Sequence, residues 1–157
     1  MWRDTVRRWL LRRWYDQRGS HWLLTPLAWL FSGITALRRW CYRHGLLQTA
    51  VLPVPVIVVG NITVGGSGKT PFVIWLAQAL KDAGYHPGII TRGYGGEARR
   101  WPLPVTSGSD PRQVGDEAVL LARRSGVPVA ADPDRVRAAQ LLIDRFSVNV
   151  VVSDDGL

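Results

Sequence analysis

The spacing of apolar residues divides the chain into two parts. From Met1 to Gln17, tryptophan, valine and leucine recur at helical spacing while the arginines fall mainly on other faces, which predicts a basic amphipathic helix. After a break at Gly19-Ser20, residues 22–37 carry no charge and predict a second, apolar helix. From Val54 onward, short apolar runs alternate with helical segments, which is the pattern of a parallel α/β sheet.

Four apolar runs predict the strands of this sheet, at residues 56–59, 88–91, 127–130 and 148–152. The first run is apolar at every position, so we expect a strand that is buried on both faces. The segments between the runs predict helices at residues 71–84, 117–124 and 133–146.

A glycine-rich loop, Gly65-Gly66-Ser67-Gly68-Lys69-Thr70, follows the first predicted strand. Its glycines allow consecutive backbone N–H groups to point at a polyphosphate, Lys69 supplies charge to the β and γ phosphates, and the Thr70 hydroxyl is placed for Mg²⁺. The usual P-loop pattern begins with glycine where this chain has Thr63. We expect ATP and Mg²⁺ as ligands, and an α/β fold with a P-loop NTPase-type, mostly parallel sheet flanked by helices.

Polar groups follow three of the predicted strands, at the edge of the sheet where ligands gather in such folds. Asp154-Asp155 ends the last strand and indicates a Walker B element that offers carboxylates to the magnesium, although an ordinary turn has the same composition. Arg92 and Tyr94 follow the second strand in a Gly-rich segment that could equally be only a turn, and Asp132-Pro133-Asp134-Arg135 follows the strand at 127–130.

Asp116 stands with Glu117 at the start of the helix predicted over 117–124. The helix dipole favours acidic residues there with no function at all, so the spacing leaves a catalytic and a structural interpretation open. His21, His44 and His86 have no partner at any metal-ligand spacing, and we assign them no role.

Charge and tryptophan are concentrated at the N-terminus. Nine arginines against two aspartates in residues 1–50 carry +7 of the formal net charge of +8, and six of the eight tryptophans lie in the first 40 residues. Arginine interleaved with tryptophan is typical of a membrane interface. Nucleic-acid binding is the competing interpretation and ranks well below a membrane, because a nucleic-acid partner would require basic residues on the folded domain as well, so we expect no nucleic-acid partner. The single cysteine, Cys41, allows no internal disulfide and fits a reducing compartment.

The apolar segment 22–37 is short for a membrane span and contains Pro26 and Gly33. A single crossing would also place the six arginines of residues 1–18 outside, against the positive-inside tendency. We therefore favour a monotopic anchor in residues 1–50 and a nucleotide-binding domain in residues 51–157. The alternative is that the two helices pack on the soluble domain, and whether 22–37 insert or lie flat stays open.

Five motifs in order, PVIVVGNITVGGSGKTP, TRGYGG, GDEA, DPDRVRAA and VVVSDDGL, closely resemble those of the lipid A disaccharide 4′-kinase (tetraacyldisaccharide 4′-kinase) family over nearly the whole chain. The resemblance implies a bacterial enzyme of lipid A and lipopolysaccharide biosynthesis, peripheral to the cytoplasmic face of the inner membrane. It implies transfer of the γ-phosphate of ATP to the 4′-hydroxyl of a lipid A precursor, a tetraacyldisaccharide 1-phosphate.

The resemblance also implies roles for single residues. Lys69 and Thr70 match the P-loop ligands, Asp154 and Asp155 match the acids of the magnesium site, and Asp116 matches a carboxylate that acts as general base on the sugar hydroxyl. The positions that match the substrate-binding cleft are Arg92, Tyr94 and Arg135.

Two departures from the family pattern bear on the activity. Ala118 stands where the family often has proline, and the family motif continues with Gln-His beyond the point where this chain ends at Leu157. We expect a fragment that lacks the C-terminal lobe, and the activity of the isolated chain is an open question. Other interpretations are a membrane-associated P-loop switch ATPase or GTPase acting on a protein, although the N-K-x-D element for guanine is absent, and a non-catalytic membrane-binding module.

Overall fold

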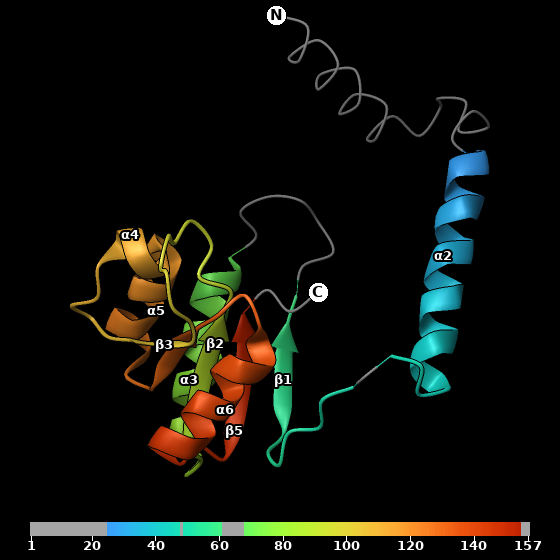
Figure 1. Cartoon of the computed structure of the whole chain (residues 1–157). Helices are drawn as coiled ribbons and strands as arrows, with labels where there is room; N and C mark the ends of the chain where they lie inside the picture. Colours follow the sequence, from blue (N-terminus) through green and yellow to red (C-terminus); the bar gives the residue numbers. More distant parts are fainter. Residues whose placement is uncertain (1–24, 48, 61–67, 155–157) are drawn as a thin grey trace, which may run out of the picture. The chain divides into compact units, whose positions relative to one another are not determined.

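The computed structural model describes residues 25–47, 49–60 and 68–154. The chain divides into two compact units, Met1–Thr49 and Ala50–Leu157, each of which is described by itself. The helix expected over residues 1–17 lies outside the described residues. In the first unit, helix α2 (Thr25–Arg43) covers the described part of the predicted apolar segment and continues beyond it to Arg43 (Figure 1).

Helix α2 exposes its large apolar side chains. Trp29 is 76% exposed and Phe31 is 68% exposed, and no residue of the helix is buried. Ser32, Thr35, Arg39 and other polar residues recur every three or four positions and so form a stripe along one side of the helix. Among the described residues, no helix is long and apolar enough to cross a membrane.

The second unit is built on a five-stranded sheet with the order β1-β5-β2-β4-β3. Four strands are parallel neighbours, and only β3 is antiparallel to the strand beside it, β4. The strands are β1 (Val56–Val59), β2 (Pro87–Thr91), β3 (Leu103–Val105), β4 (Val129–Ala131) and β5 (Val150–Asp154). This mostly parallel, helix-flanked sheet confirms the fold class that the sequence predicts.

Helices cover both faces of the sheet (Figure 1). Val73 and Ala77 of α3 share one buried cluster with α5 and with Ile89 of β2. On the opposite face, Leu142 of α6 packs in a second cluster with Val151 of β5. The helices of this unit are α3 (Lys69–Asp82), α4 (Pro111–Val114), α5 (Asp116–Ser125) and α6 (Arg135–Phe146).

Two elements and one burial pattern differ from the sequence-based expectation. Helix α4 and strand β3 were not predicted; β3 contains Pro104, which argues against a central strand but is tolerated at the sheet edge where β3 lies. The expectation that strand 56–59 is buried on both faces is wrong, because Val56 is 40% exposed and Val58 is 49% exposed. Strand β1 forms the other edge of the sheet. Helix α6 packs on β2 and β4, which β5 separates from β1.

Candidate active site

The predicted nucleotide-binding residues follow or end the parallel strands β1 and β5, whose carboxyl ends lie side by side. Asp154, the last residue of β5, pairs with Val59, the last residue of β1, and is only 2% exposed. The element that follows β1 in the chain is α3, whose first residues are Lys69 and Thr70. Gly68 precedes them with φ 72°, in the left-handed region that favours glycine.

Lys69 and Thr70 therefore occupy the N-terminus of a 14-residue helix. The first backbone N–H groups of a helix have no partner within it, and the helix dipole favours negative charge at that end. Such a terminus binds phosphate readily. Gly65, Gly66 and Ser67 of the predicted loop, and Asp155 of the predicted magnesium site, lie outside the described residues.

A hydrogen bond connects the start of α3 to the start of α5. The Thr70 hydroxyl donates to Glu117 Oε1 at 2.5 Å, and the two helices pack against each other. Because Glu117 is the second residue of α5, this contact brings the neighbouring Asp116 close to the P-loop threonine. Asp116 itself is exposed at the helix start.

Glu117 is a candidate site residue that the sequence does not single out. The sequence shows it only as part of an acidic helix start, which the helix dipole explains without function. The signal was present in the sequence as two adjacent carboxylates, but nothing in the spacing connects residue 117 with residue 70. The packing of α3 on α5 supplies that connection.

The segment after β2 is bonded along its backbone to helix α4. The N–H of Glu97 donates to the carbonyl of Arg112 at 2.8 Å, and the N–H of Ala98 donates to the carbonyl of Gln113 at 3.1 Å. Since α4 ends one residue before Gly115, these bonds fix the segment that follows β2 beside the start of α5.

Two glycines permit this close approach. A methyl group at Gly96 would lie 2.4 Å from the carbonyl oxygen of Gln113, and one at Gly115 would lie 2.4 Å from the carbonyl oxygen of Tyr94. Gly115 also has φ 91° and ψ 147°, a conformation that is essentially restricted to glycine. The backbone of Tyr94, a residue that is 84% exposed, thus lies against Gly115, which directly precedes Asp116.

The predicted site residues fall into three groups. Lys69 and Thr70 begin α3 and Asp116 begins α5, the two helix starts are joined by the Thr70–Glu117 hydrogen bond, and the backbone of Tyr94 lies against Gly115, directly before Asp116. Asp154 lies at the end of the adjacent strand pair. Arg92, directly after β2, and Arg135, the first residue of α6, belong to the neighbouring β2 and β4 ends of the same sheet.

Oxygen donors of the kind that Mg²⁺ prefers lie at the start of α3 and at the end of β5. The Thr70 hydroxyl and the Glu117 carboxylate lie together, and Asp154 adds a buried carboxylate. Within the described part of the chain no group of three or more His, Cys, Asp or Glu residues could hold a metal ion. Mg²⁺ needs no such group, because it is usually bound by one or two carboxylates together with substrate phosphates and water.

Comparison with known proteins tests the family resemblance that the motifs predict. A profile of the tetraacyldisaccharide-1-P 4′-kinase family matches residues 20–157. The chain belongs to this family. Curated family members from Nitrosococcus oceani and Alkalilimnicola ehrlichii are 55% identical over 148 residues and 56% identical over 147 residues, in each case across 94% of the chain. The predicted family resemblance is therefore confirmed.

A solved structure of another family member has a similar fold. The LpxK protein from Aquifex aeolicus, crystallised in complex with ATP, matches 88% of the chain with a TM-score of 0.72 and 37% identity. The chain spans 44% of the length of that protein and 44% of the two curated relatives.

Proposed function

We propose that the chain is the nucleotide-binding part of an ATP-dependent kinase that phosphorylates the 4′-hydroxyl of a tetraacyldisaccharide 1-phosphate, a lipid A precursor. The observation that supports the proposal is the Thr70–Glu117 hydrogen bond, because it joins the start of the proposed phosphate-binding helix to the helix that begins with Asp116, the proposed general base. Family membership supports the identity of donor and acceptor, since the curated relatives are named tetraacyldisaccharide 4′-kinases.

In this proposal, the glycine-rich loop and the start of α3 bind the triphosphate of ATP, the phosphate donor. The Lys69 ammonium and the N–H groups at the start of α3 hold phosphate oxygens, and Gly65, Gly66, Ser67 and Gly68 complete the loop. Thr70, Asp154, Asp155 and, in addition, Glu117 would hold Mg²⁺. When bound, the ion would neutralise charge on the β and γ phosphates. The crystallised ATP complex of the Aquifex aeolicus relative supports ATP as the nucleotide.

In the same proposal, Asp116 removes a proton from the sugar, the phosphate acceptor. Asp116 accepts the proton of the 4′-hydroxyl as the bond from that oxygen to the γ-phosphorus forms and the bond from the γ-phosphorus to the bridging oxygen of ADP breaks. Lys69 stabilises the charge that moves onto the phosphate oxygens. Arg92 and Arg135 bind anionic groups of the acceptor, and the exposed ring of Tyr94 lines the same cleft.

The N-terminal unit brings this site to a lipid surface. Trp29, Phe31 and the other exposed apolar side chains of α2 enter the interface, while the polar stripe that includes Arg39 faces the headgroups. We infer peripheral attachment to the cytoplasmic face of the bacterial inner membrane, with residues 1–50 as anchor and residues 51–157 as the nucleotide-binding domain.

The test uses a hybrid protein in which residues 1–157 continue into the remaining part of the Nitrosococcus oceani relative. Transfer of labelled γ-phosphate from ATP to tetraacyldisaccharide 1-phosphate is measured with and without the lipid. We expect lipid-dependent transfer that falls by about 10²–10⁴-fold in Asp116→Asn, the usual contribution of a general base.

The matched control is Asp110→Asn, another aspartate of the same segment. Asp110 caps α4 by accepting a hydrogen bond from the N–H of Arg112 at 2.9 Å, and asparagine caps a helix equally well, so transfer should not change. Full transfer by Asp116→Asn would exclude Asp116 as the base. Hydrolysis of ATP without any transfer to lipid would instead favour a switch ATPase.

A further inference from the structure

Asp132, directly after β4, is a buried carboxylate that the proposed mechanism does not use. Its side chain is completely buried, at 0% exposed. A carboxylate in such a place costs free energy unless it is paired and hydrogen-bonded, so its partners indicate what it holds in place.

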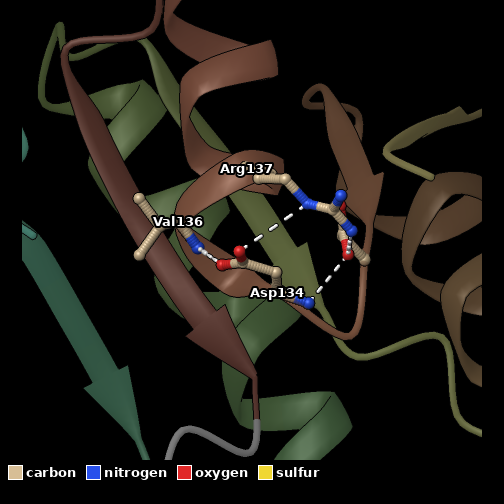
Figure 2. A network of polar contacts seen from close by, with 4 residues as sticks. Asp134, Val136 and Arg137 are labelled. Carbon is tan, nitrogen blue, oxygen red and sulfur yellow. Dashed lines mark hydrogen bonds and ion pairs between the residues drawn. The ribbon is translucent and has the colours of Figure 1, made fainter.

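The partners of Asp132 belong to two different elements. Asp132 Oδ1 accepts hydrogen bonds from the backbone N–H of Asp134, at 2.7 Å, and from Arg137 Nη2, at 2.9 Å (Figure 2). Its own backbone N–H donates to the carbonyl of Thr91, the last residue of β2, at 3.1 Å. One residue therefore ties the end of β2 to the first turn of α6.

Arg137 is the partly exposed cation that pairs with the buried Asp132 carboxylate. Its side chain is 55% exposed and also lies 3.6 Å from Asp134 Oδ2 (Figure 2). The hydrogen bond to Asp132 is the main cause that raises the pKa of the Arg137 guanidinium above its ordinary value. Asp134 also caps α6 by accepting from the N–H of Val136 at 3.0 Å, so the network fixes the whole helix start.

Both proposed substrate-binding arginines are direct chain neighbours of residues that Asp132 holds. Arg92 follows Thr91, and Arg135 follows Asp134. Asp132 links the segments that carry them, because the register of β2 with β4 ends at the pair Thr91 and Ala131 and the backbone N–H of Asp132 then donates to the carbonyl of Thr91. The backbone bond to Thr91 does not depend on the side chain of residue 132, whereas the side-chain bonds to Asp134 and Arg137 hold the start of α6, and with it Arg135, against the end of β2.

We propose that Asp132 is a positioning residue that holds Arg92 and Arg135 at the spacing needed to bind one phosphate group of the anionic acceptor. The proposal rests on the proposed function of that site, and it adds a residue that touches neither substrate. Arg137 is its counterion, so replacement of Asp132 by asparagine retains an oxygen for the N–H of Asp134 but loses the charge that holds Arg137.

The first experiment needs no kinase activity. The full chain is titrated with inorganic phosphate while the side-chain Nε–Hε signals of Arg92 and Arg135 are followed by NMR. In the unaltered chain both signals should shift along one binding curve, and in Asp132→Asn the affinity should fall by about tenfold, the effect of one charged hydrogen bond. Asp144→Asn, an exposed aspartate of α6 bonded to Gln140, is the matched control and should bind like the unaltered chain.

Either of two results would overturn the proposal: no shift of either arginine in the unaltered chain, or equal phosphate affinity in Asp132→Asn. A loss of the folded NMR spectrum in Asp132→Asn would be followed by Arg137→Lys, which keeps a cation beside Asp132 and should weaken phosphate binding less than Arg137→Ala. Equal affinities of these two variants would contradict the positioning role.

The second experiment separates positioning from general stability in the hybrid protein. Asp132→Asn should raise KM for the lipid acceptor by about tenfold and leave KM for ATP unchanged. Equal increases in both constants would mean that Asp132 only stabilises the fold. If the unaltered hybrid transfers no phosphate to lipid, the proposed function fails, while the phosphate titration still decides the role of Asp132.

Discussion

Replacement of Gly115 by alanine tests the contact that holds Tyr94 beside Asp116. Gly115 has φ 91° and ψ 147°, and this conformation costs a residue with a side chain about 1–3 kcal/mol. The added methyl group would also lie 2.4 Å from the carbonyl oxygen of Tyr94, which is backbone and cannot move away by a rotamer change. The segment after β2 must therefore shift as a whole.

That shift breaks the two backbone hydrogen bonds of Glu97 and Ala98 to α4, each worth about 1 kcal/mol. Together with the conformational cost, we expect a loss of about 3–5 kcal/mol. Each kcal/mol lowers the Tm of a domain of this size by about 4 °C, so thermal unfolding of the full chain, followed by circular dichroism, should shift down by about 12–20 °C.

Two other glycines separate the contributions. Gly95 has φ 79° with nothing within 4 Å of an added methyl group, so Gly95→Ala should lose only the cost of the left-handed conformation, about 1–2 kcal/mol. Gly108 has neither a positive φ nor a close neighbour, and Gly108→Ala should leave Tm nearly unchanged. If Gly115→Ala is no less stable than Gly95→Ala, the reasoning about the Tyr94 contact is refuted.

Three further predictions concern the proposed magnesium site and the proposed membrane anchor. Thr70→Ala should remove the Mg²⁺-dependent part of ATP affinity, measured by calorimetry with and without MgCl₂, whereas Thr70→Ser should retain it; equal behaviour of the two variants would contradict a role for the hydroxyl. Glu117→Gln should likewise reduce the gain in affinity on adding Mg²⁺, and an unchanged gain would remove Glu117 from the ligand set. Trp29→Ser with Phe31→Ser should weaken flotation with anionic vesicles by about 3–6 kcal/mol in total, whereas Ser32→Ala on the polar stripe should not; undiminished flotation would contradict interfacial insertion.

The sequence alone predicted the class of fold because its signals are local. Buried parallel strands read as apolar runs, and the glycines before Lys69 and Thr70 mark the turn from strand to helix without reference to the rest of the chain. The position of the carboxylate at Asp154 follows from the same logic, since it directly ends an apolar run.

What the sequence did not predict depends on contacts between distant residues. Glu117 and Thr70 are 47 positions apart, and their hydrogen bond results from the packing of α5 on α3. Asp132 was noted only as part of a polar turn, because its burial depends on both β2 and α6 closing over it. Val56 and Val58 were predicted to be buried, since an apolar run does not reveal which strand will form the edge of the sheet.

The exposed edge at β1 has a consequence for handling the purified chain. Among the described residues β1 pairs with β5 on one side only, and such an edge strand, with no charged residue and with exposed valines, is a template for pairing with the same strand of another molecule. We expect the 157-residue chain to associate as its concentration rises, and Val58→Lys to suppress this by placing a charge on the edge, as light scattering over a dilution series would measure. Binding titrations are therefore best run at low protein concentration, where self-association does not compete with the ligand.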